Sequence, residues 1–465
     1  MAVSLTLACV VVGIGGVPFS PPAVVACRCT NTSDACWPSE AEWNQLNASV
    51  GGHLIPVLDE LNACLGGGGV ATGQCEADLA RTDDEFFYTG QPGGYMHTGL
   101  AAGAGQDPWS IAHKLSAFAV AAQTGADVAA GVAFAAKHNL RLAVKGTGHD
   151  WFGRSGSHPD LEGSLLIWTH NMKAVKWGDG AGSSAFVAEG CSASSGVQHA
   201  VTLEAGNQFA DFYPEAEKRG RLINGGTCTS VGVGGCTLGG CFGPFSQLLG
   251  PSASNVLQAK VVLANGTLVT ASKCSHPELF WALRGGGAGH AVVTEWTMRS
   301  YPSPRWISRA SFGGEVKSAK ESDIMAVAVE VLRAADVVMA AHQGWNGDVL
   351  LPTMKSSRFG ISLSTYEGNA SIAQPLFAAF KNWIKAQPKS MQVSGSFKTS
   401  VEHKPTGPNG RIKPGAPEGQ VSLPWDDPHH DTGLSNLSFA TIRLIDTNVS
   451  TLMYRQRLGQ NTWSR

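Results

Sequence analysis

Apolar and polar positions alternate along the chain in a pattern of short buried strands and amphipathic helices. The apolar run at residues 118–122 predicts a strand, and Thr124 then stands where a helix N-cap belongs. Val128, Val132 and Ala135 recur at helical spacing before residues 140–144 resume a strand. The interval predicts a β-α-β unit, followed by a glycine-containing loop and a further strand at residues 164–169.

The alternation of apolar and polar positions predicts further helices and strands after residue 208. Phe209, Phe212, Tyr213 and Ala216 predict an amphipathic helix that ends near Gly220, and residues 221–223 form a strand before a second glycine-rich loop. Strands are then expected at 306–312, 349–354 and 359–366, and helices at 324–341 and 372–386. The overall pattern is that of an α+β protein.

Length and charge narrow the class of protein. A chain of 465 residues exceeds the size at which one core keeps growing, so two domains are expected. The 34 basic residues nearly balance the 36 acidic ones, and there is no basic block, so we expect no nucleic-acid or membrane-surface partner. No later apolar run reaches the length of about 18 residues that a membrane-spanning helix needs.

The first part of the chain indicates export. Residues 1–26 resemble a secretory signal, with an apolar centre and small residues at the end, although a basic start is missing; a buried strand is the alternative. Five cysteines follow and predict a disulfide framework whose pairing the sequence leaves open: Cys27, Cys29, Cys36, Cys64 and Cys75. Six glycosylation sequons agree with a secreted protein: Asn31, Asn47, Asn265, Asn369, Asn436 and Asn448.

Two nucleophilic side chains lie in runs of small residues. His149 stands in the run 145–150 and Cys228 in the run 226–232, which continues through further glycines to residue 243. Glycines let the backbone approach a ligand closely and leave N–H groups uncovered for a pyrophosphate or a flavin edge. Neither a dinucleotide glycine fingerprint nor a Walker lysine is present. The pair therefore favours a covalently attached cofactor over nicotinamide or a nucleoside triphosphate.

These runs carry a family resemblance. Residues 145–155, 166–170, 226–232, 280–287 and 292–294 resemble the FAD-binding domain of the vanillyl-alcohol-oxidase (PCMH-type) superfamily, in particular its berberine-bridge-enzyme-like branch. The resemblance implies a cysteine-rich segment at 27–106, a two-subdomain FAD-binding domain at 107–303, and an α+β substrate domain with an antiparallel sheet at 304–436. The final residues, 437–465, look divergent or truncated.

The resemblance also implies the cofactor and its ligands. His149 matches the histidine bonded to the flavin 8α-methyl group, and Cys228 the cysteine bonded to the dimethylbenzene ring; a disulfide to Cys191, Cys236, Cys241 or Cys274 is the alternative for Cys228. The other implied FAD-binding residues are Lys145, Gly146, Thr147, Gly148, Asp150, Gly153, Arg154, Ser155, Gly226, Thr227, Val231, Gly232, Gly234, Gly235, Gly239, Gly240 and Val262.

Several positions depart from the family pattern. Cys241 replaces a usual glycine, Cys236 replaces a histidine or aromatic residue, and residues 288–291 replace a longer glycine-rich stretch, so each could crowd the cofactor. Residues 402–434 predict a long connection, either a lid or a disordered stretch. Its acidic and histidine residues (Asp426, Asp427, His429, His430 and Asp431) lack the spacing of a metal site, so we expect a solvated loop and no metal.

The implied function is that of a secreted FAD-linked oxidoreductase. An oxidase would take hydride from an alcohol, carbohydrate or secondary-metabolite substrate and pass the electrons to molecular oxygen, acting as a monomer. The catalytic base is not assigned: Tyr366, Glu367 and Asp426 are weak candidates, and His170 lies either near the flavin or in packing. The alternatives are an FAD-binding protein that lacks turnover and an exported, disulfide-rich metal-binding protein.

Overall fold

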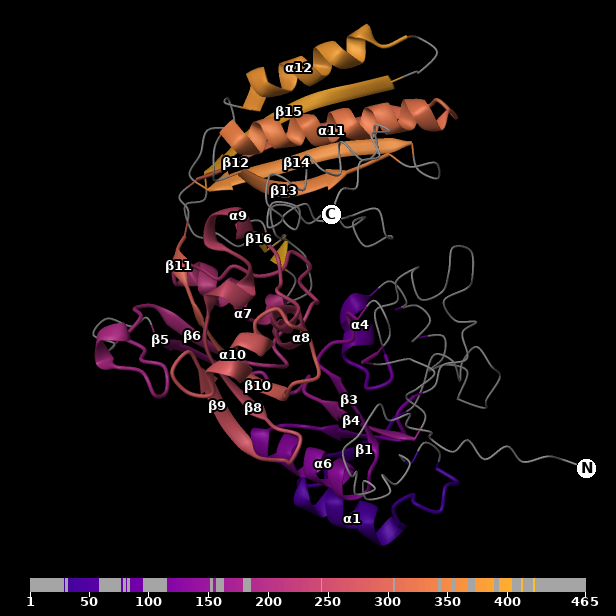
Figure 1. Ribbon diagram of the computed structural model, residues 1–465, viewed down its shortest axis with the longest axis vertical. Helices are drawn as coiled ribbons and strands as arrows, with labels where there is room; N and C mark the ends of the chain where they lie inside the picture. Colours follow the sequence, from indigo (N-terminus) through magenta and orange to yellow (C-terminus); the bar gives the residue numbers. More distant parts are fainter. Residues whose placement is uncertain are drawn as a thin grey trace, which may run out of the picture.

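The structure is a computed structural model that describes residues 29, 32–57, 77, 81, 84–94, 115–150, 154–155, 163–178, 185–243, 245–303, 306–341, 345–352, 357–366, 373–388, 393–403, 411–412 and 421–422. In this part of the chain three main sheets and their helices form two tiers, with the first two sheets in the lower tier of Figure 1 and the third above them. The expected signal at 1–26, the cluster at 426–431 and the segment 437–465 lie outside the described residues.

The first sheet carries the first glycine loop. It has the order β1 (Leu54–Pro56), β2 (Phe118–Ala121), β4 (Ser164–Trp168) and β3 (Arg141–Lys145). β2 and β3 both run parallel to β4, and β1 pairs antiparallel with β2. Because β4 lies between β2 and β3, the two strands of the predicted β-α-β unit are not neighbours, and the strand at 164–168 closes the gap between them.

The helix between β2 and β3 begins where the sequence predicts. In α6 (Gly125–Lys137), the Thr124 side chain accepts a hydrogen bond of 3.3 Å from the Asp127 backbone N–H, which confirms the N-cap. α6 packs with α1 (Glu40–Ser49) against the sheet, and Trp43 of α1 contacts the rings of Phe118 and Phe134. The described part of the segment 27–106 thus shares a core with the residues that follow it.

The second sheet is antiparallel and carries the second glycine loop. Its order is β5 (Val175–Gly178), β6 (Ala200–Glu204), β10 (Val292–Arg299), β8 (Val256–Val262) and β9 (Leu268–Ser272). Phe209 and Phe212 of α7 (Phe209–Lys218) and Phe280 of α10 (Pro277–Leu283) pack in one core with Trp296 of the sheet. The short strand β7 (Arg221–Leu222) pairs with β11 (Tyr301–Pro302) and leads into the loop before α8 (Val233–Leu238). Three short helical turns complete this region: α9 (Ser246–Leu249), η2 (Ala193–Ser195) and η3 (Ser252–Asn255).

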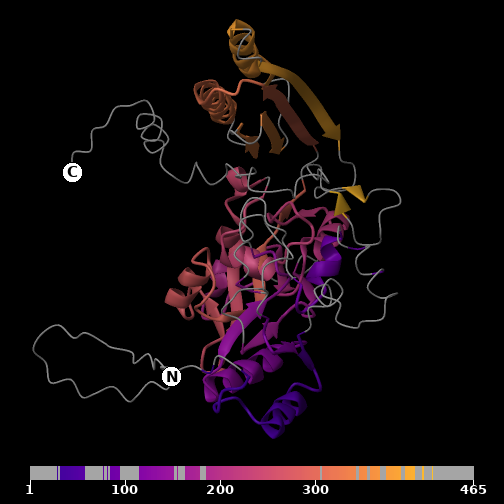
Figure 2. The same ribbon diagram turned by 90° about the vertical axis from the view of Figure 1, so that its right-hand side faces the viewer.

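The third sheet confirms the expected α+β unit with antiparallel strands. Its order is β13 (Trp345–Leu350), β14 (Arg358–Tyr366), β12 (Trp306–Val316) and β15 (Val393–His403). α11 (Glu321–Ala341) and α12 (Ala373–Ala386) cover one face of this sheet (Figure 2), where Phe312, Phe359 and Phe380 pack together.

Two sequence predictions for this unit need correction. The strand expected at 349–354 starts earlier, as β13, because residues 345–350 pair with β14. The expected connection at 402–434 begins inside β15, which pairs with β12 from Val393 to His403, and it also holds the two-residue strands β16 (Arg411–Ile412) and β17 (Val421–Ser422). The sequence of β15 does alternate, with Val393, Phe397 and Val401 on one face and only polar residues between them on the other, so this strand had a local signal that the sequence analysis missed.

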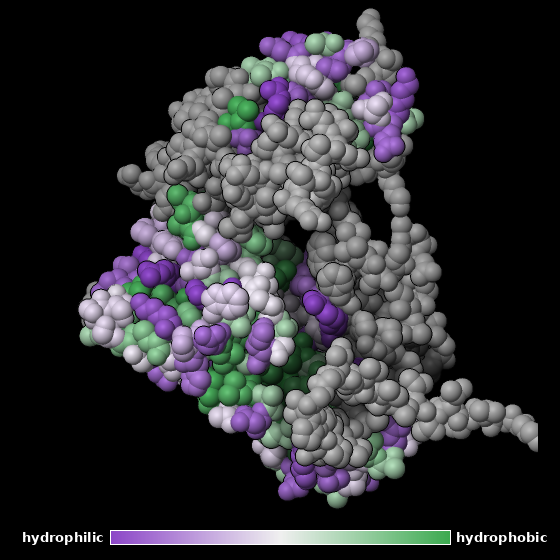
Figure 3. All heavy atoms as spheres, viewed as in Figure 1, coloured by the Kyte–Doolittle hydropathy of each residue, from purple (hydrophilic) through white to green (hydrophobic). Residues whose placement is uncertain are grey.

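The surface of the lower tier carries apolar residues near the edge strand β9. Figure 3 shows a green area in the region of β8 and β9, and Leu268 of β9 is 47% exposed. Among the described helices, none combines the length and the apolar character that a membrane crossing requires.

Candidate cofactor site

The two glycine loops meet in space. The first follows β3 and carries His149; the second follows β7 and carries Cys228 and Ser230. The Gly232 backbone N–H donates a hydrogen bond of 3.1 Å to Thr147 Oγ1, and His149 Nε2 lies 2.8 Å from Ser230 Oγ. A Cβ at Gly232 would come within 3.0 Å of the Thr147 side chain, so glycine permits this close approach. Two loops predicted separately thus form one site.

Cys228 keeps a thiol and does not pair with another cysteine. Its Sγ donates a hydrogen bond of 3.3 Å to Glu85 Oε2 and lies 3.2 Å from Ser230 Oγ. Ser230 Oγ also donates to Glu85 Oε2, so a serine hydroxyl stands between the histidine, the thiol and the carboxylate. The disulfide alternative for Cys228 is therefore not what the structure shows.

The carboxylate comes from a part of the chain that sequence reasoning did not connect with the site. Glu85 begins α4 (Glu85–Thr89), and the Gln208 side-chain N–H₂ ties this helix to the second loop by donating to Thr89 Oγ1 at 3.0 Å and to the Ser230 carbonyl at 2.7 Å. Ser230 lies in the run 226–232, two residues after Cys228, and that spacing could have signalled it. Nothing local marks Glu85, which is 143 residues from Cys228.

Lys145 has a structural position next to the site. Its buried Nζ donates to the backbone carbonyls of Gln91 at 2.5 Å, Pro92 at 2.8 Å and Gly94. Burial lowers the pKa of Lys145 to about 7, because removal from water disfavours the charged amine. These hydrogen bonds hold residues 91–94, which follow α4, against the end of β3.

Other predicted ligands of the first loop form a turn of their own. The Asp150 carboxylate accepts from Arg154 Nη2 at 3.0 Å and from the Ser155 backbone N–H at 2.9 Å, while the Arg154 side chain is largely exposed. Gly148 has a φ of +87°, which allows the chain to turn just before His149. Gly146 lies under Thr169 and Ala205, and Gly153 lies outside the described residues.

The second loop contributes both buried and open glycines. The Gly226 carbonyl accepts from the Tyr213 hydroxyl at 2.9 Å. A Cβ at Gly234 would stand 2.7 Å from the Ala205 carbonyl oxygen, whereas one at Gly235 would meet nothing within 4 Å. Thr227 and Val231 are half-buried beside Cys228, Gly239 and Gly240 end α8, and Val262 is buried in the core beneath α6. The glycines of this loop thus serve two purposes, packing at Gly234 and an open surface at Gly235.

The two cysteines that depart from the family pattern form a disulfide with each other, Cys236–Cys241. Cys241 has a φ of +55°, the left-handed region that a glycine would occupy easily. Cys191–Cys274 and Cys29–Cys36 are also bonded. The departures at 236 and 241 are therefore one covalent feature that closes the turn after α8.

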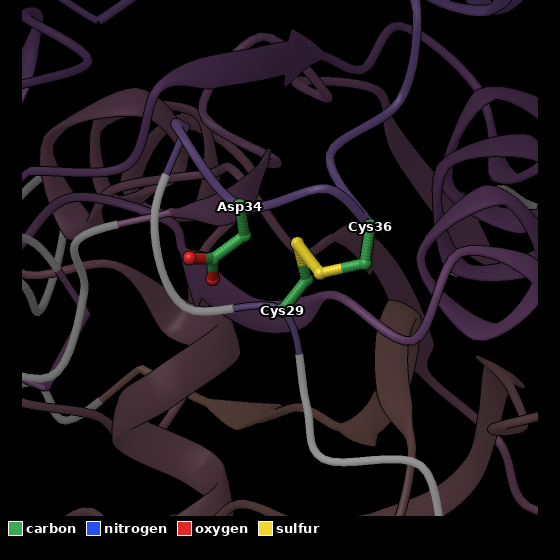
Figure 4. A group of neighbouring side chains, drawn as sticks. All are labelled: Cys29, Asp34 and Cys36. Atoms are coloured by element: carbon green, nitrogen blue, oxygen red, sulfur yellow. A yellow bond between two sulfur atoms is a disulfide. The ribbon is translucent and has the colours of Figure 1, made fainter. Parts of the chain in front are cut away.

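Two groups of described side chains have the composition of a metal site. Figure 4 shows Cys29, Asp34 and Cys36, but both sulfurs are bonded to each other, so they do not offer thiolate ligands. Glu85, His149 and Cys228 hold their donor atoms within 4.8 Å of one another. The Ser230 hydroxyl bonds to all three, and this favours a hydrogen-bonded network over a metal ion at their centre.

His170 lies at the end of β4, next to Trp168. Its ring stacks on Trp168 with centroids 5.3 Å apart and planes at 13°, at the end of β4. Burial, with smaller contributions from the charges of Lys173 and Lys145, lowers the pKa of His170 to about 4, so the ring is neutral at physiological pH. Its Nδ1 is buried without a protein hydrogen-bond partner.

The chemistry of these residues fits a flavin. An imidazole and a thiol are the side chains suited to bonding with an electron-poor ring, and here they are joined through one serine. Gly235, which is exposed on α8 directly after this loop, has open space where a side chain would stand and so leaves room for a ligand.

Comparison with known proteins agrees with this assignment. The FAD binding domain family model matches residues 116–272. The chain is 36% identical over 289 residues to the FAD-linked oxidoreductase apf9 of Gibberella fujikuroi, covering 60% of this chain and 48% of that protein. It is 32% identical over 364 residues to an uncharacterized FAD-linked oxidoreductase of Arthroderma benhamiae, covering 74% and 60%.

A solved structure shares the architecture. The VAO-type flavoprotein MtVAO713 of Myceliophthora thermophila C1 superposes with a TM-score of 0.66 and 26% identity, covering 81% of this chain and 67% of that one. The chain spans about half the length of most of the curated relatives it matches. From the two joined loops, the matched domain and the shared architecture, the FAD-binding domain of this chain belongs to the vanillyl-alcohol-oxidase type.

Proposed function

We propose that the chain is an FAD-dependent oxidoreductase of the berberine-bridge-enzyme-like branch, in which His149 and Cys228 both bond covalently to the flavin. The observation that carries the proposal is the convergence of these two nucleophiles on Ser230, at 2.8 Å and 3.2 Å. Packing alone does not require a histidine of one glycine loop and a thiol of the other to contact the same hydroxyl. The names of the relatives support the oxidoreductase class.

The proposed reaction is an oxidation of a small molecule. A flavin held by His149 and Cys228 would supply the hydride acceptor for oxidation of a carbon that bears an alcohol oxygen or an amine nitrogen, with molecular oxygen as the final electron acceptor. The chain's own part is to hold the ring rigidly through two loops and to present the third sheet, β13-β14-β12-β15, as the substrate domain. We propose that a single copy of the chain does this.

We also propose that the protein is secreted and glycosylated. The disulfides Cys29–Cys36, Cys191–Cys274 and Cys236–Cys241 support an oxidising compartment. Asn265, in the exposed turn between β8 and β9, is accessible for glycan attachment. Analysis of culture medium for a glycosylated product whose mature chain lacks residues 1–26 tests this proposal, and retention of the unprocessed chain inside the cell contradicts it.

An absorption spectrum before and after acid precipitation tests the proposed cofactor attachment. The yellow colour is expected to stay with the precipitated protein, to remain attached in Cys228→Ala through His149, and to be released when both residues are replaced. Colour that leaves the unmodified protein on precipitation would contradict covalent attachment. Hydrogen peroxide release across a panel of alcohols and sugars then tests the oxidase reaction separately.

A further inference from the structure

We propose that Glu85 is the catalytic proton acceptor for coupling of Cys228 to the flavin, and that the same carboxylate sets the tautomer of His149. This inference rests on the proposed function, because it concerns how the two attachments form. It assigns a role to a residue outside both glycine loops.

The contacts of Glu85 point to a proton acceptor. A single oxygen, Oε2, accepts from the Cys228 thiol at 3.3 Å and from the Ser230 hydroxyl. A thiol is a poor nucleophile until it loses its proton, and a carboxylate within hydrogen-bond reach can remove that proton as sulfur attacks. The Glu85 carboxylate lies within this reach of Cys228 Sγ and can therefore accept its proton.

Two sets of hydrogen bonds hold the C-terminal end of α4, the helix that Glu85 begins. Gln208 joins Thr89, at the other end of α4, to the Ser230 carbonyl. Lys145 then holds the carbonyls of residues 91–94, just after the helix. With the end of this five-residue helix held against the second loop, the Glu85 carboxylate reaches Cys228 and Ser230, and such positioning favours directed proton transfer.

The same hydrogen bonds determine the state of His149. Ser230 has one hydroxyl proton, and it donates that proton to Glu85, so its oxygen accepts from His149 Nε2 at 2.8 Å. A neutral imidazole with its proton on Nε2 carries its lone pair on Nδ1. The carboxylate thus orders both nucleophiles, the thiol directly and the imidazole through Ser230.

Formation of the thioether at Cys228 conserves atoms and electrons. As the bond forms between Sγ and a carbon of the dimethylbenzene ring, the S–H bond breaks and its proton passes to Glu85. The sulfur electron pair enters the ring system, which is then reduced by two electrons, and the hydrogen on the attacked carbon moves to a ring nitrogen as a proton. Molecular oxygen takes the two electrons with two protons and leaves as hydrogen peroxide, which returns the ring to the oxidised state with the thioether in place.

The variant Glu85→Gln tests proton acceptance by the side chain while leaving its size nearly unchanged. The amide keeps the size of the side chain but cannot take up the thiol proton, so coupling of Cys228 should slow by about 10²-fold. After denaturation, alkylation and peptide mapping, we expect flavin on His149, because the amide oxygen of glutamine still accepts the Ser230 proton, and an alkylated thiol at Cys228, whereas the unmodified protein protects Cys228. Incubation of the variant at pH 9 in air should restore the cysteine link, because the thiol then ionises in solution without a base.

Two variants serve as controls. Glu278→Gln removes an exposed carboxylate from α10 and should leave both links intact. Glu85→Asp keeps a carboxylate and should couple Cys228 faster than Glu85→Gln, even if the glutamine variant folds poorly. Full and equally fast protection of Cys228 in Glu85→Gln, or equal loss in the aspartate and glutamine variants, would overturn the role of Glu85. Absence of flavin from both residues of the unmodified protein would instead overturn the proposed function on which this inference rests.

Discussion

At the scale of single residues, the structure gives similar sequence motifs different tasks. The run 145–150 reads as one cofactor-binding stretch, yet its first residue, Lys145, bonds to carbonyls of residues 91–94 while His149 faces the Cys228 loop. A buried amine with three carbonyl acceptors holds the chain in place. Its burial also makes stability depend on pH.

Lys145→Met should remove part of that pH dependence. The folded pKa of Lys145 is about 7, well below the unfolded value, so below pH 7 both states hold the proton and the fold bears the full cost of burial. Between pH 7 and 10 the unfolded chain binds the extra proton, so stability rises with pH, by about 1 kcal/mol per unit. Urea unfolding of both proteins at pH 7, 8 and 9 measures the difference in slope. Equal slopes would show that the three carbonyls keep the amine charged.

At the scale of elements, α8 uses neighbouring glycines for different purposes. Gly234 faces the Ala205 carbonyl with no room for a Cβ, whereas Gly235 faces open space. The turn after the helix is closed by the disulfide Cys236–Cys241. Packing therefore constrains one glycine, and the proposed ligand constrains the other.

The two glycines offer a matched pair of substitutions. Gly234→Ala should lower the free energy of unfolding by about 1–3 kcal/mol, because the methyl group meets backbone that cannot move aside. Gly235→Ala should raise the free energy of unfolding of the flavin-free protein by about 0.5 kcal/mol through helix propensity. If the flavin edge approaches Gly235, that variant should also bind less flavin. Denaturant unfolding and the ratio of flavin to protein absorbance test both statements, and similar stabilities for the two variants would contradict them.

At the scale of the whole molecule, covalent links join distant parts of the second sheet. Cys191–Cys274 closes a loop with a sequence separation of 83 residues and ties residue 191, after β5, to the end of β9. Cys236–Cys241 closes a separation of only 5 residues. A cross-link restricts the unfolded chain more when the loop it closes is longer.

Removal of the longer link should therefore cost more. Replacement of Cys191 and Cys274 by serine is expected to lower the free energy of unfolding by about 4 kcal/mol, and the same change at Cys236 and Cys241 by about 2 kcal/mol. Guanidinium unfolding of the two double variants in air, compared with the unmodified protein, measures both losses. A larger loss for the short loop would show that local strain, not loop closure, dominates.

The local pattern was sufficient for most of the elements. The Thr124 cap, the apolar faces of α6 and α7 and the strand at 164–168 follow from propensity and periodicity, which act over a few residues. The antiparallel third sheet was expected from the family resemblance. The insertion of β4 between β2 and β3 follows from neither, since pairing between distant strands decides it.

The sequence by itself determined the fold class, because helices and strands follow from periodicity over a few residues. It also determined the FAD-binding motifs and the two nucleophiles, because these lie in short glycine-rich runs that let the backbone approach a ligand closely. Tertiary structure alone decided the rest of the site. It brought Glu85 to Cys228 across 143 residues, placed Ser230 between the thiol and His149, turned Lys145 toward a neighbouring loop and paired Cys236 with Cys241. These contacts depend on how separate loops pack together, and a local sequence pattern does not specify which distant residues will meet.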